Sequence, residues 1–288
     1  MIRGLYTASS GMVAQEHRMD AISNNIANAD TEGYKRDVAA FKAFPEMLLR
    51  RMNEEVSMLP PSMTPPPLGS VDNAPVTGRL GTGVELNEIY TVFEQGSLKQ
   101  TENPFDMALE SEGFFVVDTP AGERLTRNGS FHLGPEGILV TKEGFPILGE
   151  SGPIAIKENN FIIDQDGRVY ENDEFPDDPQ RLISLIENEW GETAFVDRVR
   201  LESVPNVRYL RKQGSSLWTA TDESGDQFSL EGDGRPRIHQ GFLEASNVNP
   251  VTEMVEMIEV NRAYEANQKV LQAQDESTGR LISGVMRL

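Results

Sequence analysis

Apolar residues recur every seven positions near both ends of the chain, whereas the centre has shorter apolar runs. At the N-terminus the series consists of Leu5, Met12, Met19 and Ile26. At the C-terminus it consists of Met257, Tyr264, Leu271 and Val285, with Thr278 as its polar member. An apolar period of seven residues is typical of a helix that packs along another helix. We therefore expect a long helix at each end.

Signals for the ends of these helices are also present. Gly33, preceded by turn-forming Asp30 and Thr31, is a suitable terminator of the first helix. Asn249 can cap the second helix, and Pro250 suits its first position.

Three asparagines lie close to the end of the first helix, in the segment SNNIANADTEGYKR. Asparagine is a mediocre helix former because its side chain competes for backbone hydrogen bonds. Capping explains Asn28 and the following turn. It does not explain Asn24 and Asn25, which lie on the flank of the apolar series.

The centre of the chain has the pattern of β-structure. Residues 59–83 are rich in Pro, Gly and Ser, and we interpret them as part of an extended connector. From residue 84 onwards, short alternating runs are separated by turn signals, including hairpin candidates at Pro120–Gly122, Asn128–Gly129 and Asp166–Gly167. Weaker strand candidates are Leu182–Ile186, Val207–Leu210 and Gln227–Leu230.

The expected fold class is α+β, with paired long terminal helices that form a coiled-coil-like stalk and a mostly antiparallel, β-rich middle. The expected divisions are an N-terminal helix at 1–36, a connector at 37–83, a β-rich domain at 84–244 and a C-terminal helix at 245–288.

Charge narrows the possible partners. The net charge of the 288-residue chain is −20, which argues against binding to nucleic acid or to an anionic membrane surface. Residues 1–36 are neutral overall and residues 245–288 carry −2, so the middle carries −18. This distribution indicates ends that associate and a centre that faces water. No run approaches 18 apolar residues, and the N-terminus lacks the apolar stretch of a secretory signal.

Candidate chemistry is sparse. The chain has no cysteine, and His17, His132 and His239 share no metal-ligand spacing. The stretch Asp164–Gly167 resembles the start of a calcium loop, but its twelfth position is Phe175, so a hairpin turn is the better interpretation. The acidic residues 171–178 are interpreted as a solvated loop. We expect no cofactor and no catalytic residue.

The pattern alone leaves two roles open for the terminal helices. They can form an ordinary two-helix stalk within one molecule, or they can associate with other copies into a polymer. A soluble β-domain enzyme or carbohydrate-binding module on a helical stalk is the alternative from another functional class.

Three stretches carry a family resemblance. The N-terminal GLYTASSGMVAQEHRMDAISNNIANADTEGYKRD and the C-terminal SNVNPVTEMVEMIEVNRAYEANQKVLQAQDES resemble the ends of bacterial flagellar rod and hook axial proteins. In the middle, QTENPFDMALESEGFFVV and TRNGSFHLGPEGILVTKEGFPILGESGPI are similar to the β-domain of flagellar hook–basal-body proteins.

The resemblance implies a structural subunit of the basal-body rod, not an enzyme. Such subunits pair their terminal helices in an inner layer and stack into a hollow shaft that transmits torque from motor to hook. The implied partners are further copies, other rod and hook axial proteins and the flagellar type III export apparatus, with no direct membrane insertion. The implied location is the basal body in the cell envelope, reached without a cleaved signal peptide.

The resemblance also indicates which type of axial protein the chain is: a proximal rod protein, a distal rod protein or a hook component. PILGESGPI and Asn249–Pro250 resemble proximal rod proteins, whereas GTGVELNEIYTVFEQGSLKQT and NRAYEANQKVL resemble distal ones; the proximal type is favoured. The Pro-rich segment at 59–76 departs from both patterns. A hook component is a further axial possibility, for which the chain is short.

Candidate assembly residues lie on the two terminal helices. We expect the amides of Asn24 and Asn25 to bond to neighbouring subunits and to fix the register of the apolar contacts. The full set comprises Leu5, Met12, Met19, Ile22, Asn24, Asn25, Ile26, Met254, Met257, Ile258, Tyr264, Leu271, Leu281 and Val285.

Overall fold

A computed structural model describes residues 2–50, 76–101, 103–156, 161–172, 193–214 and 216–285. The chain forms two compact units. The first comprises Met1–Ala21, Ala39–Ile89 and Val255–Leu288. The second comprises Ile22–Val38 and Tyr90–Met254.

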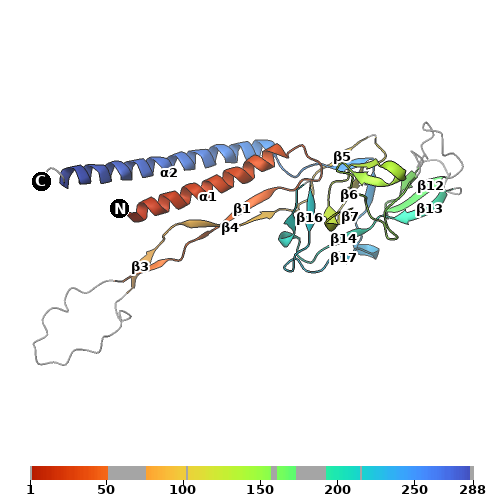
Figure 1. The fold of residues 1–288 in the computed structure, drawn as a ribbon, viewed down its shortest axis with the longest axis horizontal. Coiled ribbons are helices and arrows are strands. Elements are labelled where there is room, and N and C mark those ends of the chain that lie inside the picture. The colour runs from red at the N-terminus through yellow and green to blue at the C-terminus, as the bar shows by residue number, and fades with distance from the viewer. Residues whose placement is uncertain are drawn as a thin grey trace, which may run out of the picture. The chain divides into compact units, whose positions relative to one another are not determined.

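The first unit contains most of the two predicted helices, α1 (Ile2–Ala27) and α2 (Pro250–Val285). They run side by side in opposite directions (Figure 1). The predicted start of α2 is confirmed, because the Asn249 side-chain oxygen accepts the backbone N–H of Val251 at 3.0 Å. Gly279 and Gly284, near the C-terminus, both lie inside the continuous helix.

The N-terminal helix ends earlier than residue 36. Asn28 donates its side-chain amide to the Asn24 carbonyl at 2.8 Å, and a turn follows. Gly33 leaves this turn with φ +66°, and a β-carbon there would lie 2.6 Å from the Arg127 backbone. Both the conformation and the close approach require glycine. The capping role predicted for Asn28 is confirmed.

The predicted connector contains strands. Strand β1 (Asp37–Ala43) pairs with β4 (Val84–Thr91), and most of both strands belongs to the first unit. Strand β2 (Met47–Arg50) pairs with β3 (Val76–Leu80) within that unit. Together they form a two-stranded antiparallel ribbon (Figure 1). The extended connector predicted at 37–83 thus has paired strands at both of its ends, a pairing that the pattern did not predict. Its Pro-rich centre, up to residue 75, lies outside the described residues.

The second unit is the antiparallel β-rich part. A six-stranded sheet has the order β15-β16-β8-β7-β14-β17, a three-stranded sheet has the order β11-β12-β13, and three two-stranded sheets join β10 to β9, β18 to β6 and β19 to β5. The strands are β5 (Leu98–Gln100), β6 (Met107–Leu109), β7 (Phe114–Thr119), β8 (Gly122–Thr126), β9 (Phe131–Leu133), β10 (Leu139–Thr141), β11 (Phe161–Ile163), β12 (Arg168–Asn172), β13 (Thr193–Arg198), β14 (Leu201–Ser203), β15 (Arg211–Lys212), β16 (Leu217–Thr219), β17 (Phe228–Ser229), β18 (Ile238–Gln240) and β19 (Phe242–Glu244). Short 3₁₀ helices are η3 (Pro135–Gly137), η5 (Val207–Tyr209) and η6 (Gly232–Gly234).

Strand β7 separates two hydrophobic cores. Phe115 packs into a core with Phe131 and Leu139. Phe114 and Val116 point the other way, into a core around Trp218. Side chains alternate between the two faces of a strand, so a strand that is covered on both faces consists of continuous apolar residues.

The hairpin predictions have different outcomes. The turns at Pro120–Gly122 and Asp166–Gly167 are confirmed, because β7 pairs with β8 and β11 pairs with β12. Asn128–Gly129 does not join paired strands: β9 pairs with β10, and Gly129 passes against the Met107 carbonyl.

The weaker strand candidates also differ in outcome. The prediction at Val207–Leu210 is wrong, since the segment forms η5. The segment Gln227–Leu230 contains β17. Leu182–Ile186 lies outside the described residues.

Candidate assembly site

The contacts between α1 and α2 come from small and polar residues. A β-carbon on Gly4 would lie 2.2 Å from the Gln274 side-chain nitrogen, and one on Gly11 would lie 3.0 Å from that of Asn267. The amide side chains of α2 therefore occupy the space that these glycines leave open. Because both glycines and both amides are seven residues apart, the two contacts define a single antiparallel register.

The same seven-residue series continues along both helices. Arg18 follows Gly11 on α1, and its guanidinium lies 3.4 Å from the Glu256 carboxylate. On α2 the series through Gln274 and Asn267 includes Val260, which is fully buried. The seam between the helices thus combines glycines, amides and an ion pair with the buried Val260.

The predicted apolar series of α1 lies beside this seam. Leu5, Met12, Met19 and Ile26 each come one residue after the seam positions, a rotation of about 100° around the helix. Leu5 is 43% exposed, and the other three are half-buried. The glycines that precede Leu5 and Met12 contact α2, and the role of the apolar series in assembly stays a prediction.

The predicted residues of α2 fall into two groups. Met257, Tyr264 and Leu271 are half-buried along the seam. Met254, Ile258 and Leu281 are at least 50% exposed. Val285 is the last residue of the helix. Within the single chain, α2 therefore leaves large apolar side chains uncovered.

Asn25 is buried, and both of its amide atoms are bonded within the chain. Its Nδ2 donates to the Asp37 carbonyl at 2.9 Å and to the Glu253 carboxylate at 3.1 Å. Its Oδ1 accepts the Asp37 N–H at 2.9 Å and the Tyr34 hydroxyl at 3.1 Å. The expectation that Asn25 bonds to a neighbouring subunit does not fit this geometry. Buried Ile22 likewise faces the interior of the chain.

Asn24 occupies the exposed side of the same turn. Its Oδ1 lies 2.8 Å from the Tyr34 hydroxyl and accepts the Asn28 amide at 3.2 Å. Burial, with the nearby Asp37 carboxylate, raises the pKa of Tyr34 above its ordinary value. The hydroxyl therefore stays protonated and able to donate.

Two buried carboxylates of the second unit, those of Glu244 and Glu253, form ion pairs with basic side chains. Glu244 lies 2.5 Å from the Lys35 ammonium and 3.4 Å from the Arg127 guanidinium. Glu253 lies 2.6 Å from Arg36 Nε. Burial lowers the pKa of Lys35, and the Glu244 carboxylate counteracts this effect.

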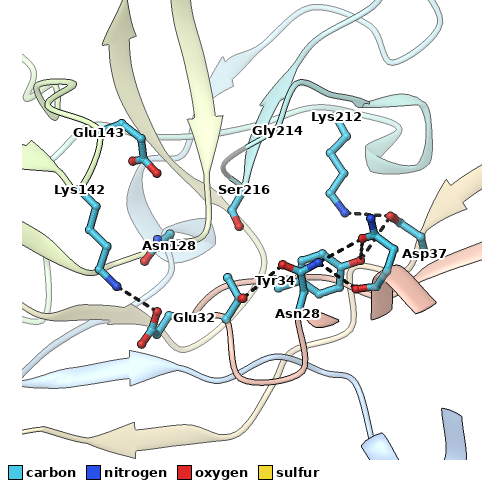
Figure 2. A pocket seen from close by; sticks show the side chains of 12 residues that line it. Asn28, Glu32, Tyr34, Asp37, Asn128, Lys142, Glu143, Lys212, Gly214 and Ser216 are labelled. Atoms are coloured by element: carbon cyan, nitrogen blue, oxygen red, sulfur yellow. Dashed lines mark hydrogen bonds and ion pairs between the residues drawn. The ribbon is translucent and has the colours of Figure 1, made fainter. Parts of the chain in front are cut away.

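A hollow of about 370 Å³ lies beside Tyr34 and Asp37. Figure 2 shows the side chains that line it. Its lining includes two ion pairs, Lys212–Asp37 at 2.8 Å and Lys142–Glu32 at 3.4 Å. The Lys212 ammonium also lies 4.1 Å from the centre of the Tyr34 ring. The charged groups are largely paired with one another, so the hollow belongs to the polar network of the turn.

The ribbon of the first unit is attached to α1 by hydroxyl groups. Ser10 Oγ accepts the Val84 N–H at 3.3 Å, and Thr7 donates to the Thr82 carbonyl at 3.3 Å. Gly83, at φ +148°, makes this approach possible, because a β-carbon there would lie 2.5 Å from Ser10 Oγ.

The three histidines lie in separate elements, α1, β9 and β18. Among the residues that the structure describes, no group of three or more His, Asp and Glu side chains could hold a metal ion. None of the helices in this described part has the length and hydrophobicity needed to cross a membrane.

Sequence reasoning missed the polar residues that organise the site. Lys35, Glu244 and Glu253 resemble any other charged residues in a chain with 72 of them, 46 acidic and 26 basic. Gly4 and Gly11 did carry a signal: two glycines seven residues apart within a predicted helix indicate a close neighbour on that face.

Three sequence-family profiles match the chain. They are described as "Flagella basal body rod protein" over residues 5–35, "Flagellar hook protein FlgE/F/G D1 domain" over 108–171 and "Flagellar basal body rod FlgEFG protein C-terminal" over 239–283. The first and third cover most of α1 and α2.

Full-length relatives show the same similarity. The chain is 34% identical to the flagellar hook-basal body complex protein FlhO of Bacillus subtilis, with 100% of both chains covered. It is 33% identical to the flagellar basal-body rod protein FlgG of Buchnera aphidicola subsp. Schizaphis graminum, covering 98% of this chain and 99% of the relative. It is 30% identical to the flagellar basal-body rod protein FlgF of Caulobacter vibrioides, covering 94% and 93%.

Proposed function

The chain belongs to the family of flagellar basal-body rod proteins, and from that premise we propose that it polymerises through α1 and α2 into the hollow axial shaft that transmits torque from motor to hook. The family is one of structural proteins of the flagellum, which serve motility. An enzymatic role is set aside on this ground.

The observation that carries the proposal is the apolar surface of the two helices. Leu5, Val13, Ile258 and Leu281 remain 43–53% exposed after the two helices have paired. Completely burying one such side chain is worth about 1.5–3 kcal/mol. Neighbouring copies that cover these residues would therefore drive assembly, and would stabilise the helices at the same time.

We propose that the α1–α2 pair is the coiled-coil-like inner layer of the shaft. The contacts of Gly4 and Gly11 set one register for the pair. A fixed register presents the outward apolar residues in one constant arrangement, which a regular lattice needs. The acidic second unit then faces water outside this layer.

The proposal extends to partners and location. The partners are further copies and other rod and hook axial proteins, as expected for the family. We propose delivery by the flagellar type III export apparatus without a cleaved signal, and a final position in the periplasmic part of the basal body. Deleting the export apparatus should retain the chain in the cytoplasm.

Within the rod we propose the proximal position, on the resemblance of PILGESGPI and Asn249–Pro250 to proximal rod proteins. Relatives named FlgG and FlgF match at similar identity. A tag inserted in the chain and located on purified basal bodies tests the position: label next to the hook would assign the distal type instead.

Substitutions on the helices test the proposed polymerisation. Met19→Asp and Leu271→Asp place a charge on half-buried apolar positions and should abolish incorporation into basal bodies and motility. The β-rich unit should keep its unfolding transition. Gln268→Asp, at an exposed position of α2, is the matched control and should remain motile. Normal motility of both apolar variants would refute the proposal.

A further inference from the structure

Asn25 and Glu253, both in the second unit, continue the seven-residue series of the helix seam. Asn25 lies two seven-residue steps after Gly11 on α1, and Glu253 lies two such steps before Asn267 on α2. The Asn25 Nδ2 donates to the Glu253 carboxylate at 3.1 Å, and each residue is 1% exposed. The pair is therefore a further layer of the same antiparallel register, and it is a buried polar one.

The segment between α1 and β1 bonds to both members of this pair. Arg36 Nε lies 2.6 Å from the Glu253 carboxylate. The Tyr34 hydroxyl and the Asp37 N–H both donate to Asn25 Oδ1. One network of side chains thus joins the last turn of α1 to the first turn of α2, and we call these two turns the base of the helices.

The base is attached to the six-stranded sheet of the second unit. Lys212, on β15, lies 2.8 Å from the Asp37 carboxylate and 4.1 Å from the centre of the Tyr34 ring. Thr91 donates to the same carboxylate at 2.7 Å. Because this sheet has its own apolar core around Trp218, the contacts that hold the base form within one chain.

The helices are less completely satisfied beyond the base. The side chains of Arg18 and Glu256 form an ion pair but are 42% and 27% exposed. Ile258, near the start of α2, is 53% exposed. A single copy therefore fixes the base more firmly than the rest of either helix.

We propose that the base is the nucleus from which α1 and α2 form in one register when the chain assembles. Starting a helix is roughly a thousandfold less favourable than extending one, because the first turn fixes several residues for a single hydrogen bond. A turn that the folded second unit already holds removes this cost for both helices. The Asn25–Glu253 bond also selects the register, as a buried polar layer does in a coiled coil.

The helix dipole alone favours a glutamate in the first turn of α2. It does not require that Glu253 be buried or that it bond to a residue of α1. The inference rests on the proposed function, because it states where in the chain the assembly-coupled folding of the helices begins.

Hydrogen exchange of the full chain as a dilute monomer tests the inference. An isolated helix frays at both ends, so its central amides exchange most slowly. We expect the reverse here: residues 22–27 should exchange more slowly than 12–16 in α1, and residues 253–257 more slowly than 266–270 in α2. Slowest exchange at the helix centres, or equal exchange along each helix, would overturn the inference.

Asn25→Leu separates the network from helix propensity. Leucine is the better helix former, so propensity alone predicts slower exchange. The inference predicts that residues 253–257 exchange about tenfold or more faster, because Glu253 loses its bond to α1. Ser23→Leu, at an exposed position of the same turn, is the matched control and should leave α2 unchanged. Equal exchange of α2 in the two variants would refute the role of Asn25.

A paired substitution covers the case in which Asn25→Leu unfolds the second unit. Asn25→Asp places two carboxylates together and should speed exchange of residues 253–257. Adding Glu253→Gln supplies an amide donor opposite the new carboxylate and should slow that exchange again. Failure of the double variant to recover counts against the Asn25–Glu253 layer.

Incorporation into basal bodies distinguishes this inference from the proposed function. Asn25→Leu should be incorporated less than Ser23→Leu, because its helices lack the nucleus. An unsubstituted chain that is present in the rod but exchanges most slowly at the helix centres refutes the nucleus and leaves the proposed function standing. Absence of the unsubstituted chain from basal bodies refutes the proposed function itself.

Discussion

Asn25 shows how a poor helix former becomes the best residue at one position. It sits near the end of α1, buried, and makes four hydrogen bonds to the Asp37 backbone, Tyr34 and Glu253. A planar amide with two donors and an acceptor satisfies groups of three residues at once. The sequence indicated that this side chain has to bond, but the partners depend on how distant segments fold.

The buried Lys35–Glu244–Arg127 cluster gives the largest expected effect of a single substitution. Glu244→Gln leaves two buried cations without their counter-ion, and should lower the free energy of unfolding of the second unit by about 3–5 kcal/mol. Urea unfolding followed by the fluorescence of buried Trp218 measures it.

The same substitution at Glu85 is the control. Glu85 pairs with Lys42 at 3.0 Å on the surface, where both side chains are more than a third exposed. Loss of such a pair costs less than about 1 kcal/mol. Equal effects at the two positions would contradict the account of the buried cluster.

The raised pKa of Tyr34 predicts that the stability of the folded chain depends on pH. Burial, with Asp37 adding to it, raises the pKa of Tyr34 in the folded chain above its ordinary value of 10.0. The unfolded chain therefore loses this proton first, and the stabilisation is complete below pH 10 and is lost as the pH rises towards the folded pKa. Relative to Tyr34→Phe, the unsubstituted chain should lose stability above pH 10 in urea titrations. Parallel curves for the two chains would exclude this role.

At the scale of elements, local patterns predicted what local interactions form. The seven-residue period predicted both helices, and Asn249 predicted the start of α2. The β1–β4 ribbon was missed because its strands pair across about fifty residues, and no local signal reports that pairing. The glycine and amide contacts between the helices were also missed, since apolar periodicity indicates which face is buried and not which partner buries it.

The attachment of the ribbon to α1 is testable through glycine. Gly83→Ala forces a β-carbon against Ser10 Oγ and the Phe44 ring at an unfavourable φ, so the ribbon should separate from α1. Hydrogen exchange of residues 84–89 should accelerate. Gly81→Ala, with nothing within 4 Å, should leave exchange unchanged. Equal protection in the two variants would argue against the attachment.

At the scale of the whole molecule, the two units differ in how completely their apolar side chains are buried. The second has two apolar cores, whereas the helices of the first leave apolar residues exposed and share a polar seam. In dilute solution, amides of α1 and α2 should therefore exchange much faster than those of β7. Protection of the helices equal to that of β7 in dilute monomer would contradict coupled folding and assembly.

A density map of the intact basal body, with this chain placed in it, tests the central claim most directly. The account predicts that α1 and α2 of successive copies form the inner layer around the channel, with the acidic β-rich unit outside. A map in which the helices face away from the channel, or in which the chain is absent from the rod, would contradict it.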